Sequence, residues 1–276
     1  MTNWRENYKS KLCTADEAIK KIAGIKRVVF GHAGSEAFAL TDALVRNKKL
    51  FNKLEIVHLV SLGKGEYAKE ENSDYFKHNA LFTVTSTREA VNSSYGDYTP
   101  TFFYEVPRLV GKNGALAGDA FLIQVSAPDE HGYCSYGLSC DYSRAGIDGA
   151  KIVIAQVNKL LPRTLGNAFV HVDEIDYIVE QDSALPEIKI PVIGEIEKKI
   201  GEYCASLVND GDTLQLGIGA IPDAALASMK DKKDLGIHSE MISDGVVDLI
   251  NLGVITNKKK NFNPNKSIVS FLMGTK

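Results

Sequence analysis

The segment 211–248 constrains the fold of this chain more strongly than any other stretch of its sequence. A short strand-like run at 213–216 leads into the turn Gly217-Ile218-Gly219, good helix formers occupy 224–229, and a second run, which is apolar, follows at 235–237. Two short strand-like runs joined through a helix are typical of parallel strands in an α/β fold. The carboxyl ends of parallel strands meet at one edge of a sheet, and ligands of open α/β sheets bind at that edge. The segment therefore predicts a ligand site at the glycine turn.

Two ionisable residues, His238 and Glu240, come directly after the second apolar run. Because side chains alternate along a strand, both should lie on one face of it. Their neighbours on the opposite face would be Ile237, Ser239 and Met241. An ionisable group at the mouth of a buried strand is costly unless it is solvated, paired or used in chemistry. The residues alone leave two interpretations of Glu240: a capping or ion-paired carboxylate, or a functional one.

Two nucleotide-binding motifs are incomplete in this sequence. A dinucleotide fingerprint requires a third glycine three residues after Gly219, and Pro222 occupies that position. The stretch Gly63-Lys64-Gly65 lacks the spaced upstream glycine and the following Ser or Thr of a P-loop. The sequence therefore argues against a Rossmann cofactor site and against a nucleoside triphosphate site.

Residues 215–224 (QLGIGAIPDA) and 236–245 (GIHSEMISDG) resemble the acetyl-CoA hydrolase/transferase family. Within that family they are most similar to the branch of 4-hydroxybutyrate and butyrate:acetate CoA-transferases. The resemblance implies that Glu240 is the nucleophile, which carries coenzyme A (CoA) as a glutamyl thioester. It also implies two α/β domains and a ligand site at the glycine turn.

The same resemblance implies the other members of the site. The segment that matches the family's CoA-contacting stretch is expected to contact CoA and to supply the oxyanion site, and it consists of Gln215, Leu216, Gly217, Ile218 and Gly219. His32 and His238 are candidates for the acyl site. His32 lies in a glycine-containing loop after the apolar run 27–30, where a histidine either orients the acyl group or makes only a structural hydrogen bond. No metal ion and no permanently bound cofactor is expected, because the CoA thioester is itself a substrate.

The function that this resemblance implies is transfer of CoA between short-chain carboxylic acids. The expected partners are acyl-CoA and carboxylate substrates, and the expected assembly is a homodimer. Covalent catalysis through the carboxylate of Glu240 predicts a ping-pong mechanism. Two alternatives stay open. One is acyl-CoA hydrolysis, which the same residues would perform if water entered the site, and the other is a non-catalytic chain that binds CoA or a partner.

Composition and charge argue against several other classes of protein. The chain has 276 residues, of which 44% are apolar and 24% charged, as in an ordinary soluble globular protein. Its formal net charge of -3 gives no electrostatic footprint for nucleic acid. No apolar stretch is long enough to span a bilayer. The N-terminal residues MTNWRENYKSK lack the apolar core of a secretory signal, so we expect a cytoplasmic protein.

The cysteines give no sign of a disulfide framework or a metal site. Four are present, at positions 13, 134, 140 and 204, without paired spacing, which favours reduced thiols. Cys134 lies three residues after His131, yet no second pair of ligands with suitable spacing follows. The sequence therefore argues against structural zinc.

Alternating apolar runs and helical segments predict two α/β domains, each with a mostly parallel sheet flanked by helices. The first is expected at 1–180, and Thr14 and Glu17 have the spacing of a capping box at the start of one of its helices. A linker at 181–192 contains two prolines, and the second domain follows at 193–276. Strands of the first domain are expected at 27–30, 54–60, 81–84, 120–125, 151–157 and 175–179.

The second domain is expected to be incomplete. It begins with a helix at 194–208, whose apolar stripe should lie on a sheet because its members recur at helical spacing: Ile196, Ile200, Tyr203 or Cys204, and Leu207. A last strand is expected at 267–272, and the sequence stops soon after it. The resemblance implies further strands and helices beyond this point. We therefore expect either a fragment or a second polypeptide that carries the missing C-terminal part.

Three further stretches have both a structural and a functional interpretation. Asp129-Glu130-His131 follows the apolar run 120–125 and is interpreted as a structural turn bordering the cleft rather than as an acid and base cluster. The aromatic residues at 95–104 indicate core or a subunit interface. Lys258-Lys259-Lys260 indicates a solvated loop, with attraction of the CoA phosphates as the functional alternative.

Overall fold

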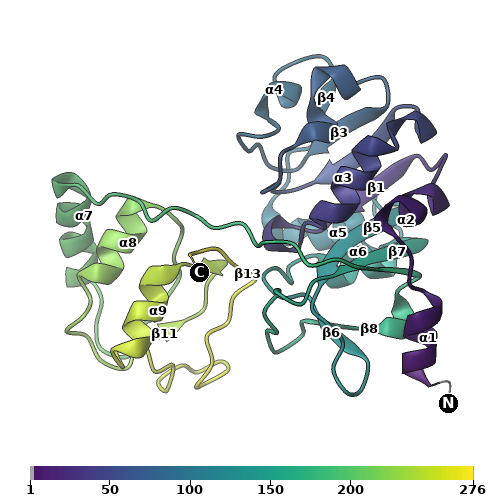
Figure 1. Ribbon diagram of the computed structural model, residues 1–276. Helices are drawn as coiled ribbons and strands as arrows, with labels where there is room; N and C mark the ends of the chain where they lie inside the picture. The colour runs from purple at the N-terminus through teal and green to yellow at the C-terminus, as the bar shows by residue number, and fades with distance from the viewer. Residues whose placement is uncertain (1–2, 276) are drawn as a thin grey trace. The chain divides into compact units, whose positions relative to one another are not determined.

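The computed structural model describes residues 3–275, and Figure 1 shows its helices and strands. The chain folds into two compact units that divide between Pro186 and Glu187. This division falls inside the segment 181–192 that was expected as a linker. Each unit has its own hydrophobic core.

A seven-stranded sheet forms the centre of the first unit. Its strands are all parallel and follow the order β4-β3-β2-β1-β5-β7-β9. The order changes direction between β1 and β5, so the carboxyl ends of these two strands form the topological switch point of the sheet. The strands are β1 (Arg27–Phe30), β2 (Leu54–His58), β3 (Phe76–Ala80), β4 (Gly96–Tyr98), β5 (Ala120–Val125), β7 (Ile152–Val157) and β9 (Tyr177–Glu180).

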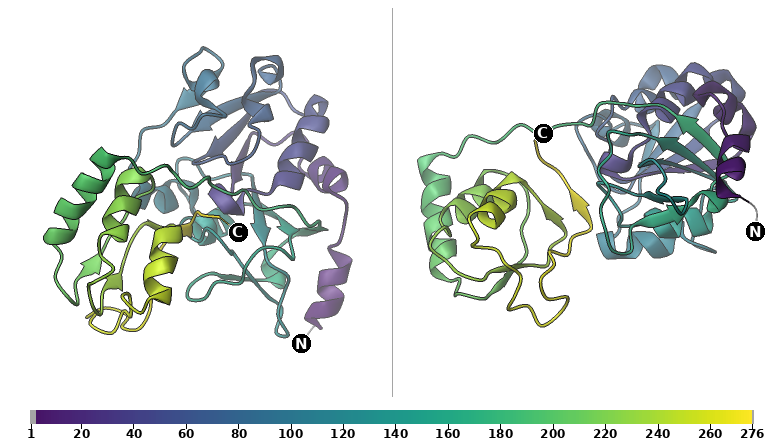
Figure 2. Two further views of the ribbon diagram at one scale, coloured as in Figure 1. Left: turned by 60° about the vertical axis from the view of Figure 1, so that its left-hand side comes forward. Right: turned by 60° about the horizontal axis from the view of Figure 1, so that its bottom comes forward.

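Helices cover both faces of this sheet (Figures 1 and 2). One core packs α2 (Ala15–Lys21) and α3 (Phe38–Arg46) against one face of the sheet. The other core packs α5 (Val106–Val110) and α6 (Ser143–Gly149) against the opposite face. Successive residues of β5 pack into the two opposite cores, so both faces of this strand are buried. The strand is therefore apolar at every position except Gln124. The remaining helices of the unit are α1 (Trp4–Ser10) and α4 (Arg88–Val91).

The start of α2 confirms the expected capping box. The hydroxyl of Thr14 accepts a hydrogen bond from the backbone N–H of Glu17 at 3.2 Å. The carboxylate of Glu17 in turn accepts one from the backbone N–H of Thr14 at 2.8 Å. Two backbone donors that the helix itself cannot pair are satisfied in this way.

The expected strand at 81–84 is wrong. The strand in this region is β3, which ends just before that segment. Its sequence, FKHNA, contains polar residues, yet His78 and Asn79 are buried. The amide of Asn79 donates to the carboxylate of Glu55 and accepts from the hydroxyl of Thr99, both at 2.8 Å. Hydrogen bonds to other elements therefore satisfy a polar residue in a buried strand, and apolar periodicity cannot reveal this.

The second unit contains short parallel strands and three helices within the described residues. Strand β10 pairs with β11 and β12 pairs with β13, both in parallel. Two single bridges, Leu235 to Ile255 and His238 to Ile268, are also parallel. The predicted α/β class with mostly parallel strands is therefore confirmed. The elements are α7 (Glu195–Ser206), β10 (Thr213–Leu214), α8 (Ala220–Ala227), β11 (Gly236–Ile237), β12 (Met241–Ile242), α9 (Asp244–Asn251) and β13 (Phe271–Leu272).

Helix α7 forms as expected, but the prediction of its packing face is wrong. Ile196, Tyr203 and Leu207 are 73%, 63% and 81% exposed, so the apolar stripe does not lie on a sheet. The helix instead packs on α8 through small residues, and Gly201 is the closest. A Cβ at Gly201 would lie 2.6 Å from the backbone of Ala224. The close approach of two helix backbones selects a glycine, and this outweighs the apolar periodicity of the stripe.

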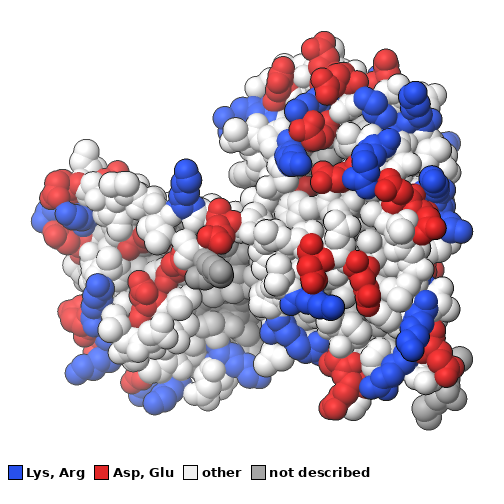
Figure 3. Space-filling view, viewed as in Figure 1, with Lys and Arg blue, Asp and Glu red and all other residues white. Residues whose placement is uncertain are grey.

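Two surface properties of the described residues bear on the expected partners. Every helix within residues 3–275 is too short or too polar to cross a membrane. On the face shown in Figure 3, acidic and basic side chains are intermingled.

Candidate functional site

The glycine turn after β10 and the segment after β11 lie side by side. The two strands pair in register, with Leu214 opposite Ile237, so the chain leaves both strands at the same edge. The hydroxyl of Ser239 accepts a hydrogen bond from the backbone N–H of Leu216 at 2.9 Å and donates to its carbonyl oxygen at 3.0 Å. The side chain of Ser239, the residue before Glu240, thus holds the start of the glycine turn in place.

The side chains after β11 alternate between buried and exposed, as predicted. Ile237, Ser239 and Met241 are buried, whereas His238 and Glu240 are exposed. The carbonyl oxygen of Glu240 accepts backbone hydrogen bonds from residues 270 and 271 at 2.9 and 3.2 Å, which holds its main chain in place.

The carboxylate of Glu240 forms no hydrogen bond or ion pair within residues 3–275. The capping or ion-paired interpretation therefore finds no partner in the described part of the chain. The arrangement is a fixed backbone that carries a free, solvent-facing carboxylate.

The glycine turn presents uncovered backbone. The N–H groups of Gly217, Ile218 and Gly219 make no hydrogen bond to any other described residue. A Cβ at Gly219 would meet no atom within 4 Å, and the φ of this residue is +120°, which favours glycine. Helix α8 begins directly after the turn, so its N-terminal dipole adds to the three N–H groups. Such a turn can hold a negative oxygen.

The remaining candidates in this unit flank the turn and the glutamate. The side chain of Gln215 is exposed just before the turn. The ring of His238 stacks on that of Phe262, with the centroids 5.6 Å apart and the planes 17° from parallel. The prediction that Lys258-Lys259-Lys260 is a solvated loop is wrong for Lys260, because this residue is only 6% exposed. Its ammonium group donates to the carbonyl oxygens of Ile237 and Lys266, at 2.7 and 2.6 Å, and ties the basic loop to the end of β11.

His32 lies at the topological switch point of the first unit, two residues after the end of β1. Its ring is buried, and Nδ1 lies 2.7 Å from a carboxylate oxygen of Asp141. The ring of Phe103 meets it edge to face, with the centroids 5.4 Å apart. These contacts agree with the structural interpretation of His32, and a role in the acyl site stays a prediction.

The aromatic segment 95–104 is neither uniformly core nor uniformly surface. Phe103 turns inward to His32, whereas Phe102 and Tyr104 are largely exposed and stack on each other with the centroids 5.7 Å apart.

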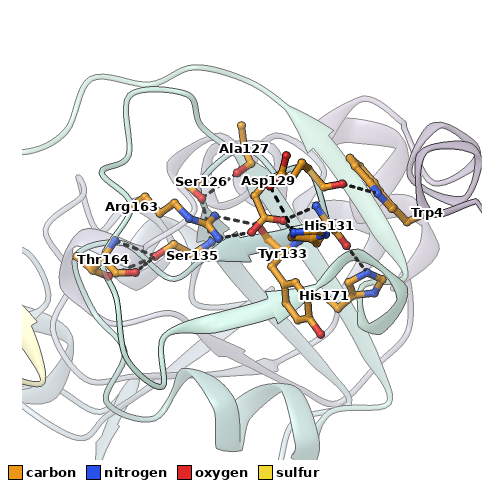
Figure 4. Close-up of polar contacts among 11 residues, drawn as sticks. Trp4, Ser126, Ala127, Asp129, His131, Tyr133, Ser135, Arg163, Thr164 and His171 are labelled. Carbon is orange, nitrogen blue, oxygen red and sulfur yellow. Dashed lines mark hydrogen bonds and ion pairs between the residues drawn. The ribbon is translucent and has the colours of Figure 1, made fainter.

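The segment Asp129-Glu130-His131 is a structural turn (Figure 4). The carboxylate of Asp129 accepts hydrogen bonds from the backbone N–H groups of His131 and Tyr133, both at 2.9 Å, and pairs with Arg163. The turn joins β5 to the antiparallel pair β6 (Tyr133–Ser135) and β8 (Phe169–His171). These contacts hold Asp129 within the turn, so the structural interpretation explains its carboxylate.

The cysteines do not form a metal site in the described part of the chain. Burial raises the pKa of Cys134 to about 12, so its thiol is protonated and a poor ligand at neutral pH. Within residues 3–275, no cluster of three or more metal-binding side chains is present. The four cysteines are free thiols.

Sequence reasoning missed Glu36, which follows the short 3-10 helix η1 (Ala33–Ser35). Glu36 is only 1% exposed and lines a cavity of about 360 Å³ at the carboxyl ends of β1 and β2. Burial raises its pKa to about 7. In the sequence, Glu36 reads as the first residue of a helix, because helix starts favour acidic residues. No local pattern distinguishes a buried glutamate from an exposed one at such a position.

Together, the fold and the site define an α/β chain in which an exposed glutamate lies beside three backbone N–H groups that have no partner in the described part of the chain. This arrangement is suited to acyl chemistry at the glutamate. Residues 1–193 match the model of the acetyl-CoA hydrolase/transferase N-terminal domain. The chain belongs to this family, and the resemblance inferred from the sequence is confirmed. The candidate site at 215–240 lies beyond the matched residues.

Relatives that cover nearly the whole chain extend this comparison to the candidate site. The chain is 59% identical to 4-hydroxybutyrate coenzyme A transferase of Clostridium kluyveri, over 99% of this chain and 63% of that protein. It is 36% identical to succinyl-CoA:cyclohexane-1-carboxylate CoA transferase of Geobacter metallireducens, over 99% of this chain and 62% of that protein. The crystal structure of RipA from Yersinia pestis superposes with a TM-score of 0.94 at 32% identity, over 99% of this chain and 66% of that chain. The chain thus spans less than two thirds of the length of these curated relatives.

Proposed function

We propose that the protein is a CoA-transferase that moves CoA between short-chain carboxylic acids through a glutamyl-CoA thioester on Glu240. The acyl donors would be 4-hydroxybutyryl-CoA or butyryl-CoA, with acetate as an acceptor. One observation carries the proposal: on a fixed backbone, the carboxylate of Glu240 lies beside a glycine turn with three N–H groups, and none of these groups has a partner among residues 3–275. The names of the relatives support CoA transfer as the class of reaction.

The first half of the reaction transfers CoA to the enzyme. The carboxylate of Glu240 attacks the carbonyl carbon of acyl-CoA, the C–S bond breaks, and a mixed anhydride and CoA thiolate form. The thiolate then attacks the Glu240 carbonyl of the anhydride. This step forms the glutamyl-CoA thioester and releases the first acid as a carboxylate.

The second half repeats these steps in reverse with another acid. Its carboxylate attacks the thioester, which gives a second anhydride and CoA thiolate. The thiolate attacks the acyl carbonyl of this anhydride, the new acyl-CoA leaves, and the carboxylate of Glu240 is restored. The balance requires no oxidant, metal ion or water.

Each attack places negative charge on a carbonyl oxygen, and we assign its stabilisation to the glycine turn. The N–H groups of Gly217, Ile218 and Gly219 make no hydrogen bond to another described residue, and the amide of Gln215 adds a side-chain donor nearby. One such donor typically lowers a barrier by about 3 kcal/mol. Leu216 completes the CoA-contacting segment, and His32 and His238 stay candidates for the acyl site.

Two alternatives are part of the proposal. Acyl-CoA hydrolysis would follow if water replaced the second carboxylate, and a non-catalytic chain that binds CoA or a partner would follow if the described residues are not sufficient for catalysis. We also propose acyl-CoA and carboxylates as partners, in a homodimer or together with a chain that matches the rest of the relatives' length.

The test is chemical trapping of the thioester in the complete protein. After incubation with butyryl-CoA, borohydride should inactivate the enzyme and mark Glu240 in a peptide mass spectrum, and without acyl-CoA it should do neither. Glu240→Gln should abolish transfer. The matched control is Glu187→Gln, which changes an exposed carboxylate without an ion pair among the described residues and should leave the rate unchanged.

Full activity of Glu240→Gln would refute the assignment of the nucleophile. Release of free thiol at the full rate without acetate would favour hydrolysis. Calorimetric binding of CoA with neither transfer nor hydrolysis would favour the non-catalytic alternative.

A further inference from the structure

Gly236, His238 and Glu240 share one face of the extended segment that contains β11. They occupy alternate positions, and successive side chains of a strand point to opposite faces. Glu240 follows Gly236 by four residues, which is about 13 Å along an extended chain. This face therefore leads from the start of β11 to the proposed nucleophile, and all of it belongs to the second unit.

The loop 257–266, which lies between α9 and β13 in Figure 1, covers part of this face. A Cβ at Gly236 would lie 2.6 Å from Cγ of Lys260, so the lysine stem occupies the space that a larger side chain would fill. The ring of Phe262 stacks on that of His238. The loop thus lies over the two positions that precede the nucleophile on this face.

Two buried side chains hold the loop against β11. The ammonium group of Lys260 donates to the carbonyl oxygens of Ile237 and Lys266, at 2.7 and 2.6 Å. The amide oxygen of Asn257 accepts a hydrogen bond from the backbone N–H of Ile237 at 2.9 Å. Because the loop binds both backbone groups of Ile237, its position on the strand is fixed.

The loop concentrates positive charge. Residues 258–266 include four lysines and no acidic residue. Lys258, Lys259 and Lys266 are exposed, and their ammonium groups form no ion pair in the described part of the chain. A cluster of unpaired cations on a fixed loop attracts a ligand with several negative charges.

The surroundings of Lys259 differ from those of a free cation. A Cβ at Gly211 would lie 3.3 Å from Cγ of Lys259, so the stem of this lysine contacts that glycine. Asp210 and Asp212 flank Gly211 in the sequence, and their charges oppose that of Lys259. We therefore assign the attraction of an anion mainly to Lys258 and Lys266.

The length of this face matches the length of the pantetheine arm of CoA. About 13 bonds separate the sulfur atom from the first phosphorus atom, as many as in roughly four residues of a polypeptide, so the extended arm spans about 15 Å. A CoA whose sulfur atom is bonded to Glu240 can therefore place its phosphates beside Gly236. This is the position over which Lys260 holds the basic loop.

We propose that the loop 257–266 is the subsite for the phosphates of CoA. Lys258 and Lys266 pair with the phosphates, and the ring of Phe262 contacts the pantetheine arm between the phosphates and Glu240. This inference rests on the proposed CoA transfer through Glu240.

The test uses the complete protein, the double variant Lys258→Gln/Lys266→Gln and two acyl donors. Butyryl-CoA carries the phosphates, and butyryl-pantetheine does not. In the variant, kcat/KM for butyryl-CoA should fall by about tenfold through a higher KM, since each exposed ion pair contributes up to about fivefold. The value for butyryl-pantetheine should change by less than about twofold.

A matched control separates the loop from the net charge of the protein. The variant Lys198→Gln/Lys199→Gln removes the same charge from exposed positions of α7, and it should change neither value. Added salt should lower kcat/KM for butyryl-CoA more steeply in the unmodified protein than in the loop variant, because salt screens exposed charges.

Phe262→Ala tests the contact with the pantetheine arm. Both donors contain this arm, so kcat/KM should fall by a similar factor for butyryl-CoA and for butyryl-pantetheine. Unchanged values for both donors would overturn the contact.

Three results would overturn the phosphate subsite while transfer continues. They are an equal loss with both donors in the double lysine variant, no loss with butyryl-CoA, and an equal loss with butyryl-CoA in the α7 control. Calorimetry with free CoA and with pantetheine separates this inference from the proposed function. If no donor reacts and nothing is trapped at Glu240, the proposed function fails, whereas CoA binding that is about tenfold weaker in the lysine variant still supports the subsite.

Discussion

Ser239→Ala tests whether the glycine turn and Glu240 act as one unit. The hydroxyl of Ser239 is the side chain that binds both the N–H and the carbonyl oxygen of Leu216, at 2.9 and 3.0 Å. Ser239 itself is buried, so its hydroxyl forms hydrogen bonds with the protein and not with solvent. Alanine removes both bonds and leaves the β10 to β11 pairing untouched.

The expected loss of stability follows from the two hydrogen bonds. Each contributes about 0.5–1.5 kcal/mol, so the free energy of unfolding should fall by about 2 kcal/mol. The expected loss of kcat follows from the displacement of the glycine turn relative to Glu240. A displacement of about 1 Å between reacting groups can cost about 100-fold. Because the paired strands still restrain the turn, we expect kcat to fall by about 10- to 100-fold, with a smaller change in KM.

Two measurements on the complete protein check these values. Urea unfolding followed by circular dichroism gives the change in stability, and transfer from butyryl-CoA to acetate gives kcat and KM. The matched control is Ser228→Ala. The hydroxyl of Ser228 follows the end of α8 and donates to the carbonyl oxygen of Ala224 at 2.9 Å. This bond lies away from the turn, so the control should affect stability slightly and kcat not at all.

The measured changes in stability and in kcat of Ser239→Ala separate a structural role of this hydroxyl from a role in catalysis. Reduced stability with an unchanged kcat would refute the claim that this hydroxyl positions the turn for catalysis. Unchanged stability and unchanged kcat would refute the geometry itself.

Two further predictions concern stability. Burial lowers the pKa of His78 to about 4. Between pH 6.5 and 4 the unfolded chain therefore binds a proton at His78 that the folded chain does not bind. The free energy of unfolding should not be reduced by this residue above pH 6.5, and it should fall by about 3 kcal/mol as the pH drops toward 4. Urea unfolding at several pH values checks this, and His78→Phe should flatten the dependence; an equal slope in both proteins contradicts it. For Gly236→Ala, the new Cβ would lie 2.6 Å from Cγ of Lys260 and 3.0 Å from the hydroxyl of Thr213, so we expect a loss of about 1–3 kcal/mol and a lower melting temperature. An unchanged melting temperature would show that Lys260 moves aside freely.

The sequence predicted the candidate site well where its geometry depends on local periodicity. Two short strand-like runs separated by a helix indicated parallel strands, and β10 and β11 pair in this way. Alternation along the second run indicated which residues would be buried, and Ser239 and Glu240 lie on the expected opposite sides. Both inferences need only the two-residue period of a strand and the connection rule for parallel pairs.

Packing partners were predicted poorly, because the sequence does not show which element faces a given stripe. The apolar stripe of α7 was expected to lie on a sheet, yet Gly201 allows the backbones of α7 and α8 to approach. Lys260 was expected in a solvated loop, yet two carbonyl oxygens from other segments hold its ammonium group. The sequence alone does not show which element will pack against a given glycine, or which groups will hydrogen-bond to a given lysine.

The sequence by itself determined the α/β class, which depends on short-range periodicity, and the family, which depends on residue order; the resemblance to that family is what implies Glu240 as the nucleophile. Only the tertiary structure decided that Glu36 is buried, that it lines a cavity, and that Gly63 lies so close to its carboxylate that a Cβ there would be 2.6 Å from Oε1. The physical reason is that burial and hydrogen-bond satisfaction are set by loops that are distant in sequence. These loops meet only when parallel strands align their carboxyl ends at one edge of the sheet.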